Sequence, residues 1–177
     1  MAVLPVVKYG DPILRKKTSK VVEFDNLDSL IDDMFDTMYE EEGIGLAANQ
    51  VGKNINLMVL DVSHLEEFET VEPMVLINSK IVDTEGEVEI EEGCLSIPDI
   101  RASIIRPETI TLSFKDENGV EKNEKYSGMM SRVIQHEIDH LNGKFFTDYL
   151  SPAKRKFIHN RLLEIAKTGK PTTGVIV

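Results

Sequence analysis

The residues best suited to chemistry in this sequence are two histidines and a glutamate in the segment QHEIDHLNG, residues 135–143. His136 and His140 are four residues apart, so on a helix their side chains lie on one face, close enough to share one ion. Glu137 follows the first histidine, where a carboxylate can reach a water on that ion rather than the ion itself. Apolar residues at helical spacing on both sides predict that the segment is a helix. The pattern therefore indicates a metal site.

Two histidines do not complete a catalytic metal site, so a third ligand has to come from elsewhere in the chain. In one class of zinc proteases the motif continues to a third histidine, but Phe146 stands at that position here. Glu164 can supply a carboxylate from a following helix, as in another class. We favour Cys94, the single cysteine, because a thiolate is a strong ligand for divalent transition metals. The remaining histidines, His64 and His159, are expected to be exposed.

One cysteine and two histidines leave a coordination position open for water, which is typical of catalytic sites. The metal would lower the pKa of that water, and Glu137 would take its proton and later pass it to a leaving amine. The residues alone thus predict hydrolysis of an amide-like bond. Two alternatives stay open: an HExxH metallopeptidase with Glu164 as third ligand, and a non-enzymatic binding module stabilised by a closed four-ligand metal site.

The composition predicts an ordinary folded protein of the cytoplasm. The chain has 177 residues, of which 41% are hydrophobic. It has no apolar run near the roughly 18 residues needed to cross a bilayer. A single cysteine allows no internal disulfide, which fits a reducing compartment. The formal net charge of −11 disfavours binding to DNA or to anionic membranes.

The elements expected around these residues give an α+β fold with a single catalytic domain at residues 1–167. Hydrophobic periodicity predicts an N-terminal helix from Leu27 to Met38 and a C-terminal helix at about residues 152–167. We expect short antiparallel strands to pack around a central HExxH metal-binding helix, within a metal-binding core at residues 43–143. Residues 168–177 are expected to form a flexible tail. The predicted strands are Ile55–Asp61, Met74–Val82, Glu87–Glu91, Thr109–Phe114 and Val120–Tyr126.

Three motifs, in this order, closely resemble those of the peptide deformylases. They are GIGLAANQ at residues 43–50, EGCLS at residues 92–96 and QHEIDHLNG at residues 135–143. The opening segment YGDPILRKKT is also similar to that of the family, and the resemblance covers most of residues 8–150. It implies a metal-dependent hydrolase that removes the N-formyl group from the N-terminal formyl-methionine of newly synthesised polypeptides and releases formate.

The resemblance also implies the roles of the catalytic groups. Cys94, His136 and His140 would bind one divalent metal ion, usually Fe²⁺, with Zn²⁺ or Ni²⁺ as substitutes. Glu137 would be the general acid and base. The side-chain amide of Gln50 and the backbone N–H of Leu95 would donate hydrogen bonds to the oxyanion formed when the formyl carbon is attacked.

Substrate-binding residues are expected in the same three motifs and close to them. Gly43 and Gly45 would let the peptide backbone approach closely. Gly93, which lets the chain turn sharply, is a further substrate-binding candidate. Arg101 resembles the residue that contacts the peptide further along, and a surface salt bridge is the alternative for this side chain. The candidates for the methionine pocket are Ile44, Met129, Val133 and the ring of His136. Arg132 stands where the family often has an apolar residue, and it either marks the mouth of this pocket or pairs with an acid outside it.

The C-terminal segment, residues 151–177, has six basic residues against one acidic residue. A solvated helix face is one interpretation of this charge. Family members with a long final helix use it to dock near the ribosomal exit, where RNA is the polyanion and the substrate emerges. The resemblance therefore implies the ribosome as a partner of this segment.

Overall fold

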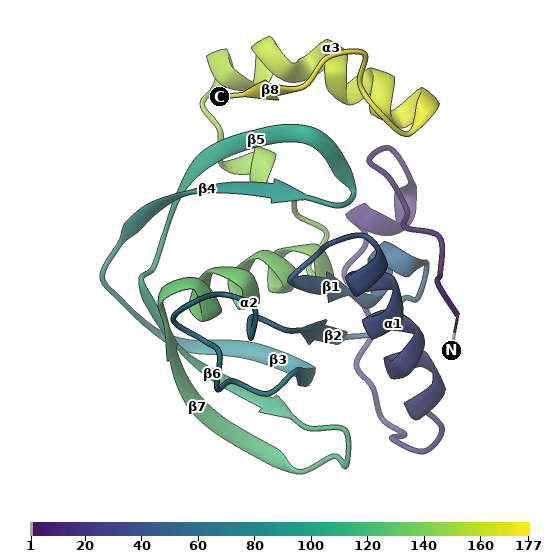
Figure 1. Cartoon of the computed structure of the whole chain (residues 1–177), viewed down its shortest axis with the longest axis vertical. Coiled ribbons are helices and arrows are strands. Elements are labelled where there is room, and N and C mark those ends of the chain that lie inside the picture. The colour runs from purple at the N-terminus through teal and green to yellow at the C-terminus, as the bar shows by residue number, and fades with distance from the viewer. Residues whose placement is uncertain (1) are drawn as a thin grey trace.

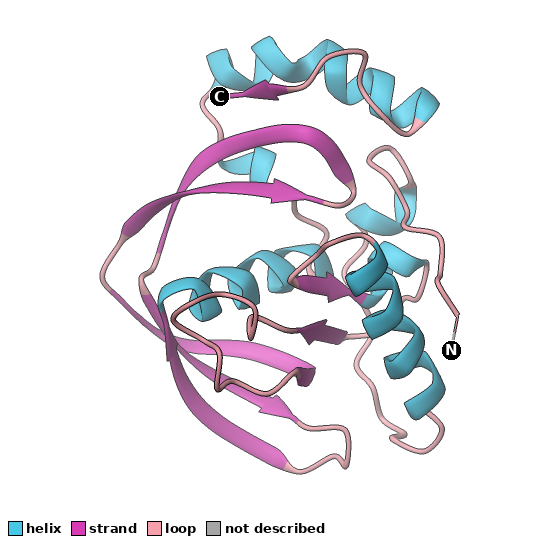
Figure 2. Cartoon of the chain, in the orientation of Figure 1, coloured by secondary structure: helices cyan, strands magenta, loops and turns pink. Residues whose placement is uncertain are grey.

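Helices and strands alternate irregularly along the chain in a computed structural model that describes residues 2–177 (Figure 1, Figure 2). The helices are α1 (Asp28–Glu40), α2 (Gly128–Leu141) and α3 (Pro152–Thr168). The strands are β1 (Gly45–Ala47), β2 (Leu57–Leu60), β3 (Met74–Glu85), β4 (Val88–Cys94), β5 (Ile97–Arg106), β6 (Thr109–Lys115), β7 (Glu121–Ser127) and β8 (Val175–Ile176). Among the described residues, no helix has both the length and the apolar character needed to cross a membrane.

The strands form two sheets. The five-stranded sheet has the order β1-β2-β3-β6-β7, and each neighbouring pair in it is antiparallel. The second sheet contains the antiparallel hairpin β4–β5, and β8 pairs with β5 in parallel. Sequential strands mostly pair with each other, and residues 2–177 show no alternating βαβ units. The prediction of an α+β fold with antiparallel sheets and helices is thus confirmed.

Strand β5 is absent from the sequence prediction. It begins with Ile97 and Pro98, and a proline normally argues against a strand because it cannot donate to the hydrogen-bond ladder. Proline is tolerated near a strand's first residue, which is its place here. Further along, Ile100, Ala102 and Ile104 are buried on alternate positions, so the rest of β5 has the pattern of a strand with one buried face.

Helix α2 lies between the β4–β5 hairpin and the five-stranded sheet (Figure 1). Its apolar side chains, among them Ile134 and Leu141, are buried against β2 and β6 in one hydrophobic cluster. Burying a side chain of this size contributes about 1.5–3 kcal/mol, so the cluster fixes the rotation of the helix about its axis. In that rotation His136 and His140 contact residues of β4.

Residues 168–177 were expected to form a flexible tail, but in the structure they return along α3 and end in β8 (Figure 1). Val175 pairs with Ile100, and the next residue pairs with Arg101. The backbone N–H of Thr172 donates to the Glu164 carboxylate at 2.7 Å. The pairing with β5 joins residues far apart in the sequence, so the composition of the tail gives no sign of it.

Candidate metal centre

Cys94, His136 and His140 lie together at the centre of the molecule. Cys94 ends β4, and the two histidines are one turn apart on α2. The Cys94 Sγ is 3.1 Å from His140 Nε2, which is 3.2 Å from His136 Nε2. Among the described residues they form the one group of three or more such side chains with all donor atoms within 4.8 Å of one another. The structure therefore brings together the three predicted ligands.

The imidazole of His136 is oriented by a buried carboxylate. His136 Nδ1 is 2.8 Å from the Glu92 Oε2, so Nε2 is the nitrogen left to face the cluster. Arg106 holds the same carboxylate through two bonds, from Nε to Oε1 at 2.6 Å and from Nη2 to Oε2 at 3.0 Å. Burial alone would raise the pKa of Glu92, but the bonds from His136 and Arg106 hold it well below its ordinary value. Glu92 is therefore a carboxylate that accepts from His136.

The electrostatics of the cluster favour an ionised thiol. Burial alone would raise the pKa of the Cys94 thiol, but the neighbouring His140 and His136 hold it well below its ordinary value. A thiolate and two imidazole nitrogens are a donor set suited to a divalent transition metal. Because His136 Nδ1 is bonded to Glu92, its Nε2 is free to bind a metal together with the Cys94 sulfur and a nitrogen of His140. The residues present thus fit the metal that the sequence implies.

Glu137 lies beside the cluster, and its carboxylate is nearly inaccessible to solvent. The side chain is buried, and its Oε2 makes no hydrogen bond within the described part of the chain. Burial raises the pKa of this carboxyl, although the charges of His136 and His140 act in the opposite direction. A buried carboxyl with one uncommitted oxygen next to three converging donors is suited to exchange protons with a reacting group.

Gln50 and Leu95 are both neighbours of Cys94. The Oε1 of Gln50 accepts from the backbone N–H of Ala47 at 2.9 Å, which fixes the orientation of the amide. Its Nε2 then donates to Ser96 Oγ at 3.2 Å and approaches Cys94 Sγ at 3.7 Å. Leu95 follows Cys94 directly, and its carbonyl accepts from the Lys8 ammonium at 2.8 Å. Both predicted donors are thus held next to the cluster.

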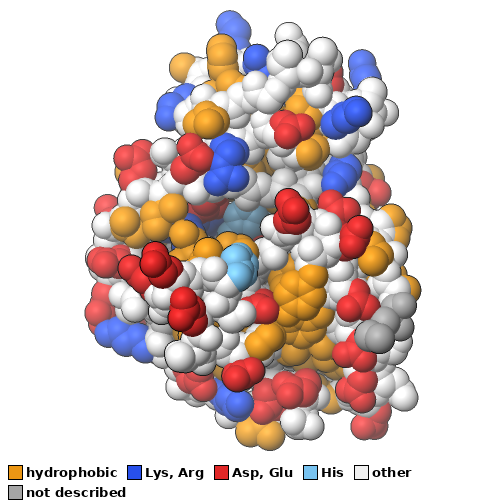
Figure 3. Space-filling model, in the orientation of Figure 1, with side chains coloured by type: hydrophobic (Ala, Val, Ile, Leu, Met, Phe, Trp, Pro, Cys, Tyr) orange, Lys and Arg blue, Asp and Glu red, His pale blue; other side chains and the backbone are white. Residues whose placement is uncertain are grey.

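A cleft of about 650 Å³ opens over the cluster. Figure 3 shows it as a hollow near the middle of the face, with histidine atoms at its back. Cys94, His136 and Glu137 line it, together with charged groups at its rim. All the residues predicted to bind substrate also line it: Ile44, Gly45, Gly93, Arg101, Met129 and Val133. The structure therefore gathers these residues from four separate segments around one opening.

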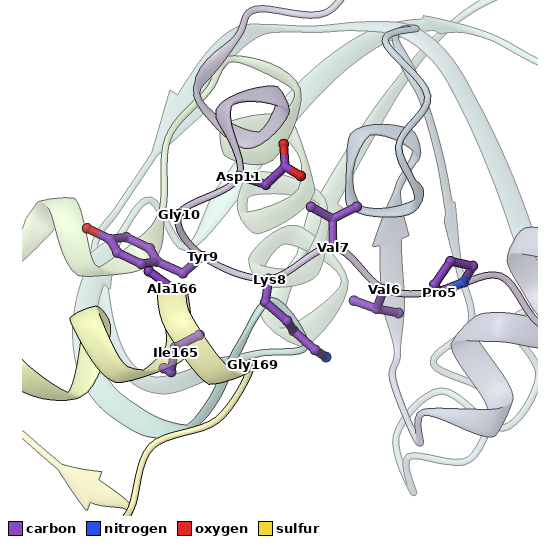
Figure 4. A pocket seen from close by; sticks show the side chains of 10 residues that line it. All are labelled: Pro5, Val6, Val7, Lys8, Tyr9, Gly10, Asp11, Ile165, Ala166 and Gly169. Atoms are coloured by element: carbon purple, nitrogen blue, oxygen red, sulfur yellow. The ribbon is translucent and has the colours of Figure 1, made fainter.

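A second cleft, of about 380 Å³, lies between the N-terminal segment and the end of α3 (Figure 4). Residues 5–11 form one wall, and Ile165, Ala166 and Gly169 form the other. No residue of the metal cluster lines it. Lys8 lines both clefts, because its backbone belongs to this wall while its ammonium reaches Leu95. Candidate metal-binding and acid–base side chains therefore line the larger cleft and not this one.

The other candidate ligands lie outside the cluster. Glu164 is not among the converging side chains, and its carboxylate accepts from the backbone of Thr172. His64 and His159 are exposed, as expected. Arg132 was expected either to mark the mouth of the pocket or to pair with an acid outside it. It does pair with an acid, since its Nη1 is 2.8 Å from Glu92 Oε1, but both side chains of this pair are buried.

Two buried residues of the site had no role in the sequence prediction, Glu92 and Arg106. Glu92 lies two residues before Cys94 on the same strand, and both side chains contact histidines of α2. An acid at that spacing from the candidate metal-binding cysteine was a usable signal. No sequence signal pointed to Arg106, because its pairing with Glu92 depends on the register of β4 against β5.

Fold and site together define an α+β protein with a Cys-His-His cluster beside a buried carboxyl group. A profile of the family "Polypeptide deformylase" matches residues 3–156. The peptide deformylase of Chlorobium luteolum is 46% identical over 165 residues, which is 93% of this chain and 87% of that protein. The peptide deformylase of Xylella fastidiosa is 45% identical over 166 residues, or 92% of this chain and 95% of that protein.

Solved structures show the same relationship. A peptide deformylase from Legionella pneumophila superposes with a TM-score of 0.85 at 39% identity, over 95% of this chain and 98% of that one. The Ehrlichia chaffeensis enzyme in complex with actinonin has a TM-score of 0.85 at 40% identity, over 95% and 99% of the two chains. This chain belongs to the polypeptide deformylase family.

Proposed function

We propose that this protein removes the N-formyl group from the N-terminal formyl-methionine of newly synthesised polypeptides and releases formate. The observation that carries the proposal is the convergence of Cys94, His136 and His140, with the buried Glu137 beside them, in one solvent-open cleft. Family membership supplies the substrate, and the site supplies the groups that the hydrolysis of a formamide needs. On this proposal α2 is the central metal-binding helix of the fold.

Cys94, His136 and His140 would hold one divalent metal ion. When bound, the ion supplies Lewis acidity, which polarises a carbonyl and makes water a nucleophile near neutral pH. We propose Fe²⁺ as the ion, following the family. Sulfur and two imidazoles suit Zn²⁺ and Ni²⁺ as well, so metal analysis of protein purified without air is the measurement that decides.

Glu137 acts as general base and then as general acid. Its uncommitted Oε2 takes the proton of the attacking water and later delivers it to the departing α-amine. Such a role usually contributes about 10²–10⁴-fold to the rate. Burial of the carboxyl keeps its pKa above the ordinary value, which makes the carboxylate a stronger base towards the attacking water.

Gln50 and Leu95 stabilise the charge that develops on the formyl oxygen. The Gln50 amide is held by its bond to Ala47, so its N–H groups keep their direction while the oxyanion forms. The backbone N–H of Leu95 is the second donor. Preorganised donors of this kind contribute because they need no reorientation during the reaction, and the loss of one typically costs about 10²–10³ in kcat.

The remaining residues of the cleft bind the peptide. Ile44, Met129 and Val133 form the apolar pocket for the methionine side chain. Gly45 and Gly93 let the peptide backbone approach. Arg101, whose guanidinium is about half exposed and pairs with Glu91 at 2.6 Å, contacts the peptide further from the metal.

The decisive test is formate release from formyl-methionyl peptides, with acetyl-methionyl peptides as matched controls and with Fe²⁺ under anaerobic conditions. Formate from the first set alone supports the proposal, and none would refute it. The Glu137→Gln variant should keep its metal and lose at least about 10²-fold in kcat. Unchanged function in that variant would instead favour a binding module.

We also propose that the protein works in the cytoplasm and that its C-terminal segment, residues 151–177, docks on the ribosome. Lys154, Arg155 and Lys156 are exposed in the first turns of α3, so they are available to a polyanion. Deleting the segment would be a poor test, because α3 is anchored in a hydrophobic cluster. Replacing the three cations with glutamine should lower salt-sensitive ribosome binding while formate release is retained. Unchanged binding would refute the idea.

A further inference from the structure

Arg132 is a buried residue of the cleft that the proposed reaction does not use. It lies on α2, one turn before His136, and its side chain is 4% exposed. Its guanidinium makes bonds to three different groups. Nη1 donates to Glu92 Oε1 at 2.8 Å and to the carbonyl of Ile104 at 2.9 Å, and Nη2 donates to the carbonyl of Val88 at 2.7 Å. These groups lie on β4 and β5, so Arg132 ties α2 to both strands of the hairpin.

The carboxylate that Arg132 contacts is the one that orients His136. Oε1 of Glu92 receives Arg132 and the Nε of Arg106 at 2.6 Å. Oε2 receives the second Arg106 bond and His136 Nδ1 at 2.8 Å. With these four bonds, neither oxygen can rotate away from its partners without breaking at least one of them. The orientation of the imidazole thus depends on a carboxylate fixed by two guanidinium groups.

Charge balance explains why Arg106 alone does not neutralise the buried carboxylates near His136. Arg106 divides its charge between two carboxylates, because its Nη1 is also 2.7 Å from Asp139 Oδ2. With Arg132 the cluster has two guanidinium groups for two carboxylates. Without it, a nearly inaccessible Glu92 would share a single cation with Asp139. A buried charge without full compensation is costly, and relief would come from movement of Glu92 towards other partners or towards water.

The position of Glu92 in the chain extends the effect to the third ligand. Glu92 and Cys94 are separated by one residue at the end of β4, where the pairing with β5 shifts register. A strand end with a register shift is held less firmly by its own ladder. The contacts of Arg132 with Val88 and Glu92 attach this strand to the helix that carries both histidines.

We propose that Arg132 is a positioning residue of the metal centre. It fixes the Glu92 carboxylate, and through it the imidazole of His136, and it sets the distance between Cys94 and the two histidines. The inference rests on the proposed metal site, and it assigns Arg132 neither contact with the metal nor a part in proton transfer. Lysine could not replace Arg132 fully. Its single ammonium group cannot donate to all three acceptors, which are placed to suit the spread N–H groups of a planar guanidinium.

The test measures metal binding in the full-length protein, without substrate. Co²⁺ is the probe, because its affinity can be measured by competition with a chelator and its visible absorption reports the geometry of thiolate coordination. Loss of a residue that orients a ligand typically lowers metal affinity by about 10–100-fold. We expect a loss in that range for Arg132→Met, with an altered Co²⁺ spectrum, and a smaller loss for Arg132→Lys.

Two controls separate positioning from general stability. Lys125→Met removes a cation from an exposed pair with Glu85 and should leave Co²⁺ affinity unchanged. In a Glu92→Gln background, Arg132→Met should have a much smaller effect on Co²⁺ affinity than in the native background, because the group through which it acts has changed. If Arg132→Met lowers Co²⁺ affinity by the same factor in both backgrounds, Arg132 does not act through Glu92.

A wild-type Co²⁺ affinity and spectrum in Arg132→Met would overturn the proposal, even if the variant melted at a lower temperature. If Arg132→Met does not fold, the Co²⁺ affinity and spectrum of Arg132→Lys decide instead. Wild-type values in that variant would also overturn the proposal. Because no substrate is present, these results are independent of the proposed reaction. Absence of formate release would remove the deformylase proposal and leave the metal-binding result standing.

Discussion

Replacing Gly45 with alanine is expected to impair catalysis while the fold survives. Gly45 lines the cleft, and a Cβ added there would lie 2.7 Å from Val133 Cγ1 and 2.8 Å from Glu137 Oε1. Apolar carbon atoms pack best at about 3.5–4.0 Å, so the new methyl group must displace one or both neighbours by roughly 1 Å. The backbone of Gly45 needs no positive φ, so alanine introduces no strain of its own.

The expected size of the effect follows from that displacement. Misplacing a catalytic group by about 1 Å can cost roughly 10²-fold in rate, which corresponds to about 2.7 kcal/mol of activation free energy. Overpacking in a tightly packed region costs about 1–3 kcal/mol of stability, which a folded domain can tolerate. We therefore expect a kcat about 10²-fold lower for Gly45→Ala, in protein that remains folded and keeps its metal.

Gly93→Ala is the matched comparison. A Cβ at Gly93 would meet the Nη1 of Arg101 at 2.8 Å, but that atom is the end of a flexible, half-exposed side chain. The guanidinium can move aside, so KM for the peptide should rise while kcat changes little. The assay is formate release over a range of peptide concentrations, with metal content and circular dichroism measured for each variant. A wild-type kcat in fully metallated Gly45→Ala would refute the reasoning.

Three further predictions concern metal and stability. Cys94→Ser should lose its metal on dialysis, whereas full retention would point to another third ligand. Gly143→Ala should lower the free energy of unfolding by at least about 2 kcal/mol, seen as a lower melting temperature, because φ is +75° and the Cβ would overlap the Arg15 carbonyl oxygen. Burial raises the pKa of Asp61, but hydrogen bonds from Ser63 outweigh this and hold it below 3.8. The ionised carboxyl therefore stabilises the fold above that pH and ceases to do so as the pH falls through its lower folded pKa. The melting-temperature deficit of Asp61→Asn should thus be full at pH 7 and shrink below about pH 4, and a deficit independent of pH would contradict this.

The fold was predictable where local signals are strong. The helices around residues 28–40 and 152–168 follow from apolar spacing, and the Asp116–Gly119 turn marks the hairpin between β6 and β7. The strand β5 was missed because Pro98 obscured its start. The tail was misjudged because strand β8 exists only through its pairing with β5 and has no helix or strand pattern of its own.

The sequence by itself determined the chemical groups of the site. The spacing of His136 and His140 on a helix places two imidazoles on one face, and a single cysteine leaves little choice of thiol, so a candidate ligand set could be predicted without coordinates. The tertiary structure decided how those three side chains are held. Glu92, Arg106 and Arg132 meet behind His136 only because the hairpin β4–β5 packs against α2 in one register. Contacts between residues distant in the chain depend on that packing, and local patterns do not encode it.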